Sequence, residues 1–262
     1  MLEKPKHLAP EYGAQFKDRS IVEAYRHRPP YPAEVFDILA GLISAEPRRV
    51  LDVGCGIGYL ARHFVEHVEQ LDAVDFSQHM IETGKQLPNG DHPRLRWFYG
   101  AVEDIALDPP YALVTAGESL HWMDWHFVLP RFKESLVPGG YLAIVSHDNT
   151  LPEPWYDVLR DIIPQYSTNK DFEPYDLIEE LELRGLFQKV GEKTTAPVPF
   201  VQSVDDYIES YHSRNGFSRD RMEPDQAAAF DQEARKILLK THKDGVMHLQ
   251  VIGTVIWGLP MG

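Results

Sequence analysis

The residues with the clearest chemical meaning lie between positions 50 and 58, where an apolar run ends in an acid and glycines follow at alternate positions. Val50-Leu51-Asp52-Val53 has the composition of a buried strand, and Gly54, Gly56 and Gly58 come directly after it. Glycines let the backbone approach a ligand closely, because no Cβ intervenes and positive φ is accessible. A helix that begins here directs unpaired N–H groups and its positive dipole end towards a negative group. The pattern predicts a site for a nucleotide-type cofactor.

The glycine turn by itself leaves the cofactor class open. A dinucleotide fingerprint, G-x-G-x-x-G/A, fits residues 56–61, and Asp75 lies near the distance expected for a ribose-binding acid. If the fingerprint starts at Gly54 instead, it requires Gly or Ala at position 59, and Tyr59 stands there. A dinucleotide-dependent oxidoreductase is therefore the weaker of the interpretations.

The turn and four later segments together resemble class I S-adenosylmethionine-dependent methyltransferases. The acid-x-Gly-x-Gly-x-Gly turn is similar to the first motif of that family. The later segments are Val74-Asp75-Phe76-Ser77 (ribose), residues 100–105 (adenine edge), residues 116–122 (the strand end facing the reacting methyl group) and residues 136–140 (the turn before the fifth strand). The resemblance covers about residues 16–147. It implies S-adenosyl-L-methionine as the cofactor and methyl transfer as the activity.

Some further segments are similar to the trans-aconitate methyltransferase-like subgroup, which acts on small molecules. They are Phe16, Ala24-Tyr25-Arg26, residues 28–32, His121-Trp122 and residues 207–211. This resemblance implies a small-molecule acceptor, with carboxylates among the candidates. The acceptor atom stays open between O, N, S and C.

The family resemblance implies a set of residues that hold the cofactor. The Asp75 carboxylate, with two oxygens, suits the two hydroxyls of a ribose. Asp52 either orders the glycine loop or reaches the methionine amino group through water, while Cys55 is expected only to fit the tight turn. Phe76 and Met80 either sandwich the adenine ring or belong to the core. The full set is Asp52, Gly54, Gly56, Gly58, Asp75, Phe76, Met80, Val102, Glu103, Asp104 and Gly117.

His121 is the candidate catalytic residue. It follows a strand end expected to face the methyl group, and histidine is a suitable general base near neutral pH. The alternative is that His121 packs and hydrogen-bonds beside Trp122. Methyl transfer is an in-line displacement, so a base is needed only when the nucleophile arrives protonated. His63 and His67 are four residues apart on an expected helix, and we expect surface positions and no metal there.

These motifs require a scaffold that brings several strand ends to one edge. Helix and strand patterns alternate from residue 33 to about 147, which predicts right-handed βαβ crossovers and a parallel sheet with covered faces. The expected fold is α/β, a Rossmann-like methyltransferase fold with a mostly parallel, doubly wound, seven-stranded sheet. Strands are expected at 49–53, 70–76, 95–99, 112–116 and 141–146, and helices at 33–44, 59–68, 77–86 (with Ser77 as N-cap) and 127–136.

A helical cap is expected after the fifth strand. Residues 147–175 are too irregular for another βα unit and too aromatic for a linker, with prolines at 152, 154, 164 and 174. Helices follow at 176–184, 203–211 and 224–242, with one strand within 187–201. We expect one methyltransferase domain over 1–262: an N-terminal segment at 1–32, a cofactor-binding core at 33–147, a cap with an interleaved strand at 147–242 and a final strand at 246–258. Candidates to line a substrate cavity in the cap are Trp155, Tyr156, Tyr166, Tyr175, Tyr211 and Arg214, with Arg219 and Arg221 available for a carboxylate.

The amino-acid composition argues against some classes of binding partner. Lys and Arg number 26 against 40 Asp and Glu, a formal charge of −14, which argues against nucleic acid and anionic membrane surfaces. Cys55 is the single cysteine, no leader-like or membrane-spanning apolar run is present, and a cytoplasmic setting is the simplest. Monomer and homodimer stay open. So do two other functions: a non-catalytic S-adenosylmethionine-binding protein, and a methyltransferase acting on protein or RNA.

Overall fold

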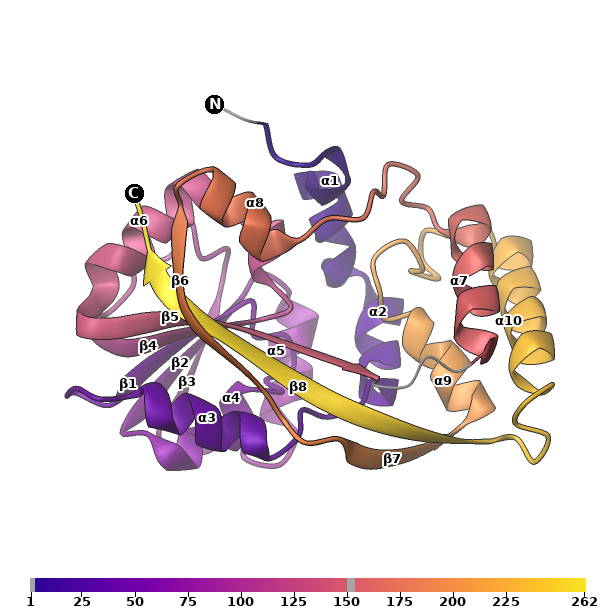
Figure 1. Ribbon diagram of the computed structural model, residues 1–262, viewed down its shortest axis with the longest axis horizontal. Helices are drawn as coiled ribbons and strands as arrows, with labels where there is room; N and C mark the ends of the chain where they lie inside the picture. Colours follow the sequence, from indigo (N-terminus) through magenta and orange to yellow (C-terminus); the bar gives the residue numbers. More distant parts are fainter. Residues whose placement is uncertain (1–2, 150–153) are drawn as a thin grey trace.

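A computed structural model describes residues 3–149 and 154–262 of the chain (Figure 1). Within these residues, eight strands form one sheet in the order β3-β2-β1-β4-β5-β8-β6, and β7 pairs with β8. β1 to β5 pair in parallel, whereas the pairs made by β8 are antiparallel. The strands are β1 (Arg49–Val53), β2 (Gln70–Asp75), β3 (Leu95–Tyr99), β4 (Tyr111–Gly117), β5 (Leu136–Asn149), β6 (Phe187–Thr194), β7 (Val198–Ser203) and β8 (Val246–Pro260).

The strand order reverses between β1 and β4. Val50 of β1 pairs with Leu71 of β2 on one side and with Leu113 of β4 on the other. The connections that leave these two strands run in opposite directions, which opens a crevice at their carboxyl ends. The doubly wound α/β fold expected from the sequence is confirmed, and the crevice lies where the glycine turn follows β1.

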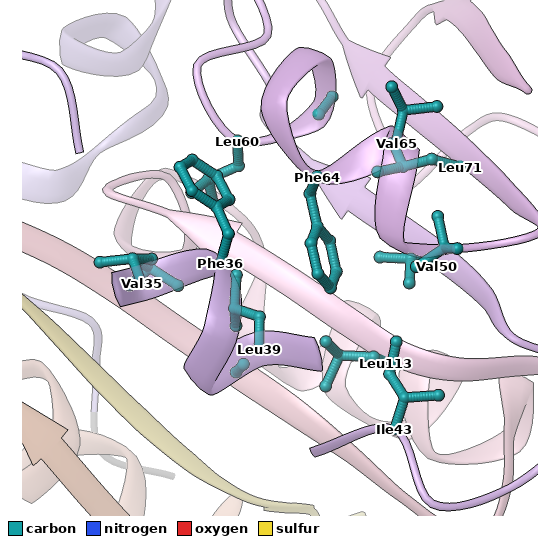
Figure 2. Packing of buried hydrophobic residues seen from close by; sticks show 14 of the residues in the cluster. Val35, Phe36, Leu39, Ile43, Val50, Leu60, Phe64, Val65, Leu71 and Leu113 are labelled. Atoms are coloured by element: carbon teal, nitrogen blue, oxygen red, sulfur yellow. The ribbon is translucent and has the colours of Figure 1, made fainter. Parts of the chain in front are cut away.

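One face of the sheet is covered by α3 (Glu34–Leu42) and α4 (Ala61–Phe64). Phe36 and Leu39, three residues apart on α3, point between the helix and the strands, where they meet Phe64 (Figure 2). Leu39 and Phe64 are at most 1% exposed. Burial of side chains of this size contributes about 1.5–3 kcal/mol each. The helix predicted at 59–68 is shorter in the structure, because a 3-10 turn, η4 (Val65–His67), follows α4.

The opposite face is covered by α6 (Trp125–Ser135) and α8 (Leu177–Leu183). Leu51, which follows Val50 in β1, points to this side and packs with Val128, Phe132 and Leu181. The Asp124 carboxylate caps α6 by accepting the His126 N–H at 3.1 Å. The adjacent strand residues thus enter different cores, as the pleat of a parallel sheet requires.

The N-terminal segment lies over the carboxyl edge of the sheet. Its short elements are η1 (Lys6–Leu8), α1 (Pro10–Gly13), η2 (Ala14–Lys17), α2 (Arg19–Ala24) and η3 (Tyr25–His27). α2 buries Ile21 and Val22 against Ile57 of the glycine turn and Met80 of α5 (Gln78–Lys85). Apolar contacts therefore fasten this segment beside the turn.

Three helices, α7 (Pro154–Tyr166), α9 (Val204–Tyr211) and α10 (Pro224–Leu238), lie together at the right of Figure 1. Their apolar faces share a separate cluster that includes Leu159, Tyr207 and Phe230 and the start of β8. The expectation that 147–175 is irregular is wrong for α7. Pro154 begins this helix, where a missing N–H costs nothing, and Pro164 lies in its last turn. Pro152 lies outside the described residues.

The expected seven strands are eight, because the single strand predicted within 187–201 is two. β6 pairs with residues 254–260 of β8, and β7 pairs with residues 246–251. The 15-residue β8 is long enough to hold both. Pro197 lies between them and lacks the N–H that an uninterrupted ladder would need.

Other boundaries differ in smaller ways. β5 already begins at Leu136, and the turn expected at 138–140 is a bulge within it: Leu136 pairs with Tyr111 and Tyr141 pairs with Leu113. Gly139 adopts φ +82° there. The last strand ends at Pro260, two residues later than expected. Within the described residues, no helix is long and apolar enough to cross a membrane.

Candidate active site

A cavity of ≈ 490 Å³, named here the edge cavity, opens at the carboxyl ends of β1, β2 and β4. Its walls come from the glycine turn, the β2 and β4 ends, the loop after β3 and the N-terminal segment. The residues of the expected cofactor set that line it are Gly54, Gly56, Asp75, Phe76, Met80, Val102, Glu103, Asp104 and Gly117. The fold therefore brings to one cavity nine residues that are spread over 64 positions of the chain.

The glycine turn approaches the cavity with its backbone. Gly54 and Gly56 have φ of +65° and +54°, in the left-handed region that favours glycine. A Cβ at Gly54 would lie 2.5 Å from the Ser119 Cβ. Gly58 has φ +80° but does not line the edge cavity, and its Cβ would meet Trp97 and Arg62 instead. The structure thus places Gly58 at a packing position.

Asp75 ends β2 with its carboxylate already engaged by the backbone. One oxygen accepts the Gly56 N–H and the other accepts the Ser77 N–H, each at 2.7 Å. Each oxygen keeps a second lone pair. Burial raises the pKa of Asp75 to about 6, although both N–H groups oppose the rise. Ser77 is the N-cap of α5 by position, but its hydroxyl makes no capping bond, so the role predicted for its side chain is wrong.

Asp52 lies behind the turn rather than on the edge cavity. It is 1% exposed, and one oxygen accepts the Thr115 hydroxyl at 2.9 Å. The other oxygen, Oδ2, has no hydrogen-bond partner among the described residues. Burial raises the pKa of Asp52 to about 7. Asp52 lines a small cavity of ≈ 20 Å³, shared with Gly117 and Glu118, which is about the space of one water molecule.

The loop after β3 is held in place from behind by Arg131 of α6. The Arg131 guanidinium donates to the Val102, Glu103 and Ile105 carbonyls, the Glu103 bond measuring 2.9 Å. The Glu103 carboxylate accepts the Asp124 N–H at 3.0 Å. The loop is thereby fixed on one side of the edge cavity.

Phe76 and Met80 lie on the edge cavity, and Lys17 reaches over the Phe76 ring at 5.1 Å. Met80 is 2% exposed and belongs as well to the apolar cluster beneath α2. Met80 therefore belongs both to the cavity wall and to the core, the two roles that the sequence left open.

His121 does not line any of the cavities described here. It lies in η5 (Leu120–Trp122), and its ring packs against Trp122 at 4.7 Å. Burial lowers the pKa of His121 to about 4. A base of this pKa is neutral at pH 7 but weak. Its neighbours Ser119 and Trp122 line the edge cavity instead.

The edge cavity has further wall residues outside the predicted cofactor set, contributed by the N-terminal segment, the β2 and β4 ends, the start of the loop after β3 and the residues before α6. They are Pro10, Gly13, Ala14, Phe16, Lys17, Tyr25, Val74, Gly100, Ala101, Glu118, Ser119, Trp122, Met123 and Asp124. Phe16 and Tyr25 belong to segments with a family resemblance, and Glu118, Ser119 and Trp122 lie within the quoted 116–122 motif. Their motifs indicated these residues, but only the packing of the N-terminal segment over the sheet edge brings Phe16 and Tyr25 to the same wall as the residues after β4.

A further cavity of ≈ 310 Å³, named here the polar cavity, lies between β5, η3 and the cap. Glu118 lines the edge, small and polar cavities alike. The wall of the polar cavity is Arg28, Pro29, Glu118, His147, Asp148, Tyr156, Gln202, Tyr207, Ser210, Arg214 and Leu249. Charged and hydroxyl groups from core and cap thus surround one space beside the β4 end.

The cap residues proposed for a substrate cavity divide into two groups. Tyr156 and Arg214 line the polar cavity. The other candidates do not line it. The aromatic ones pack inside the protein: Trp155 and Tyr211 are buried in the cap cluster, Tyr166 packs on Phe230, and Tyr175 packs on His7. The two arginines form ion pairs, Arg219 with Glu209 and Asp231, and Arg221 with Asp18. Within the described residues, no group of three or more His, Cys, Asp or Glu side chains could hold a metal ion.

The sequence of the sheet core matches a known family. Residues 50–140 match the family described as Methyltransferase domain. These residues form a methyltransferase domain. The methyltransferase domain contains the glycine turn, Asp75, the Val102–Asp104 loop and Glu118, so the family match and the edge cavity coincide.

Curated relatives share this part of the chain. An uncharacterized methyltransferase of Mycobacterium tuberculosis (strain ATCC 25618 / H37Rv) is 34% identical over 146 residues, 55% of this chain and 57% of the relative. The trans-aconitate 2-methyltransferase of Methylobacterium nodulans is 33% identical over 130 residues, 48% of each chain. The chain spans about half the length of these relatives. The resemblance to the trans-aconitate subgroup is confirmed at the level of sequence similarity.

The fold of the methyltransferase domain and its additions is found in solved structures. A putative type II methyltransferase from Anaeromyxobacter dehalogenans superposes with a TM-score of 0.64 at 22% identity, covering 89% of this chain and 97% of that one. The Rossmann-like methyltransferase architecture is therefore established for nearly the whole chain.

Proposed function

We propose that this chain binds S-adenosylmethionine in the edge cavity and transfers its methyl group to a small molecule held in the polar cavity. The observation that carries this proposal is the second cavity itself, which adjoins the β4 end and shares Glu118 with the edge cavity. A protein that only sensed the cofactor would have no need of a second polar pocket there. The proposal thus favours an enzyme over a non-catalytic binding protein.

The chemistry of the residues at the edge cavity fits this cofactor. The second lone pairs of Asp75 suit the ribose hydroxyls, and Gly54 lines the cavity at a backbone conformation and a close approach to Ser119 that exclude a Cβ. The unpaired Asp52 oxygen suits the methionine amino group, directly or through the water-sized small cavity. Glu103 or Asp104 accepts the adenine amino group, with Phe76 and Met80 beside the ring. When bound, the cofactor supplies a methyl group on a positively charged sulfur.

We further propose the division of labour expected from the sequence, in which 33–147 holds the cofactor and 147–242 selects the acceptor. The polar cavity supports this division, because three of its wall residues belong to the cap: Tyr156, Tyr207 and Arg214. Arg28 of the N-terminal segment and His147 at the start of the cap complete the wall towards the core. A relative named for trans-aconitate supports a small carboxylate-bearing acceptor. We place the reaction in the cytoplasm, the setting that a chain with the single cysteine Cys55 favours.

A protein or RNA acceptor is the weaker alternative. The polar cavity is walled by cap helices, and its size is at the low end for ligand pockets. The net charge of −14 disfavours RNA. Small molecules therefore fit this space best.

The test is calorimetric titration with S-adenosylhomocysteine and, separately, with NAD. We expect binding of S-adenosylhomocysteine and none of NAD. Binding of NAD without binding of S-adenosylhomocysteine would refute the assignment of S-adenosylmethionine as the cofactor. Incubation with tritiated S-adenosylmethionine and pools of small carboxylates, a protein lysate and total RNA then separates the acceptor classes, and label is expected in the small-molecule fraction.

A further inference from the structure

The polar cavity is lined by a histidine and a carboxylate that lie side by side. Glu118 directly follows β4 and His147 lies on the neighbouring strand β5, with Glu118 Oε1 3.5 Å from His147 Nδ1. The main-chain N–H of His147 also donates to Glu118 Oε1 at 3.3 Å. Two contacts from one residue therefore hold the carboxylate against one side of the imidazole.

Backbone and charge fix Glu118 in this position. It has φ +49°, which is unusual for a residue with a side chain, and its N–H donates to the Val145 carbonyl at 2.9 Å. Arg28 lies 3.8 Å from its other oxygen. Burial raises the pKa of Glu118, but Arg28, Arg214, the main-chain N–H of His147 and the charged form of the His147 ring together lower it by more, so that the pKa stays below its ordinary value. The carboxylate is ionised at neutral pH.

An ionised carboxylate accepts hydrogen bonds but donates none, so it favours the His147 tautomer with the proton on Nδ1. Nδ1 is buried without a hydrogen-bond partner among the described residues, and the 3.5 Å separation is longer than an ordinary hydrogen bond. Catalytic contacts of this kind often shorten once substrate is bound. Nε2 then carries a lone pair on the other side of the ring.

The surroundings of His147 keep it neutral. Burial lowers its pKa; Glu118 and Asp148 oppose this, while Arg28 and Arg214 add to it. Its ring meets Tyr31 edge-on at 4.8 Å, and Tyr156 and Tyr207 line the same cavity. The imidazole is therefore neutral at pH 7 and, unlike that of His121, it lines a cavity and lies beside a carboxylate.

The two arginines of the polar cavity differ in what they bind. Arg28 donates to the Ser213 hydroxyl at 2.7 Å, to the Ser213 carbonyl at 2.5 Å and to the Tyr25 hydroxyl at 3.2 Å, which leaves it little capacity for a ligand. The Arg214 guanidinium stacks over the Tyr211 ring at 4.3 Å and makes no hydrogen bond to another described residue. Its five donors suit a carboxylate or phosphate.

We propose that the polar cavity takes a small acceptor with an anionic group, which Arg214 binds, and a hydroxyl, amine or thiol, from which His147 removes the proton while Glu118 orients the ring. This inference rests on the proposed function. As the acceptor atom forms its bond to the methyl carbon, the methyl–sulfur bond breaks and its electron pair stays on the sulfur. The acceptor proton passes to His147 Nε2 and then to solvent. A carboxylate as the acceptor atom would need no such base.

The acceptor-independent test is nitrogen NMR of the full chain labelled at histidine, with and without S-adenosylhomocysteine. We expect the His147 signals of the Nδ1–H tautomer, and a shift of those signals in Glu118→Gln. An Nε2–H tautomer, or signals that Glu118→Gln leaves unmoved, would overturn the proposal. Failure of S-adenosylhomocysteine to bind would refute the proposed function, whereas the tautomer is read in either case.

The kinetic test uses 4-hydroxybenzoate, β-alanine and 3-mercaptopropionate as probes, with fumarate and trans-aconitate as carboxylates that lack a protonated nucleophile. We expect His147→Gln to slow methylation of the first group by about 10²–10⁴-fold and to remove the acid limb of its pH profile. S-adenosylhomocysteine affinity should be unchanged, and His248→Gln, on the exposed face of β8, should behave as wild type. Arg214→Met should raise KM for these probes while kcat falls less. Methylation confined to fumarate or trans-aconitate contradicts the proposal, as does a pH profile that His147→Gln leaves intact.

Discussion

Asp75 Oδ2 accepts the Gly56 N–H at 2.7 Å, which joins the end of β2 to the glycine turn after β1. The same carboxylate accepts the Ser77 N–H with its other oxygen. The acid that faces the proposed ribose therefore also fixes the loop that faces the rest of the cofactor. Loss of this charge is expected to act on binding through both contacts.

Asp75→Asn should weaken S-adenosylhomocysteine binding by tenfold or more, about 1.4 kcal/mol. The amide offers one accepting oxygen, so it cannot serve Gly56, Ser77 and a ribose together. Calorimetry measures the affinity, and Asp91→Asn, an exposed acid, is the matched control. Equal affinities for the two variants would remove Asp75 from the site.

The affinity of the wild-type chain for S-adenosylhomocysteine should fall as the pH drops below about 6. The pKa of Asp75 is raised to about 6 by burial, and hydroxyl donors prefer its ionised form. The contribution of Asp75 to the affinity is therefore present well above this pH and declines as the proton binds. Titrations from pH 5 to 8 check the slope, and the part of it centred near pH 6 should disappear in Asp75→Asn.

Asp52→Asn should change how stability depends on pH. Burial raises the folded-state pKa of Asp52 from 3.8 to about 7, so the folded state holds a proton that the unfolded state releases. The stabilisation of the folded state by this proton is fully present below pH 3.8 and is lost as the pH rises towards 7. Above pH 7 both states lack the proton, and Asp52 no longer makes the free energy of unfolding depend on pH. The loss is at most about 1.4 kcal/mol per pH unit. Urea unfolding at pH 5, 6, 7 and 8 should show the wild-type stability falling relative to the variant up to pH 7; parallel curves would contradict the raised pKa.

Gly54→Ala should abolish detectable S-adenosylhomocysteine binding and lower the melting temperature. Its Cβ would lie 2.5 Å from the Ser119 Cβ, at φ +65°. Gly41→Ala is the matched control, because nothing lies within 4 Å of its Cβ on α3. That change should stabilise the chain by about 0.4–1 kcal/mol. Normal binding and an unchanged melting temperature in Gly54→Ala would contradict the close approach of Gly54 to Ser119.

Arg131→Met should weaken cofactor binding through the loop it holds, although Arg131 does not line the edge cavity. The Val102, Glu103 and Ile105 carbonyls lose their common donor, so the loop gains freedom that binding must remove. We expect KM for S-adenosylmethionine to rise about tenfold with kcat less affected. Lys133→Met, an exposed change on the same helix, is the comparison, and a fall in kcat alone would argue against a positioning role.

The strands around the site could be predicted because their signals are local. β1 and β3 have the predicted bounds, and the Gly54–Gly58 turn follows β1 directly. The cap was harder. α7 was missed because prolines at its two ends read as breaks, and β7 was merged with β6 because only pairing with β8 shows where the ladder is interrupted.

The sequence by itself determined the parallel core, the glycine turn and the acid at 75, since each depends on side-chain spacing within a few residues. Only the tertiary structure decided which residues share a cavity. His121 was the sequence candidate for a base, yet the chain packs it against Trp122, whereas His147 lies beside Glu118 across two paired strands. Arg214 reaches the same cavity from the cap, 67 positions further along. Strand pairing and cap packing set these distances, and neither is encoded in local spacing.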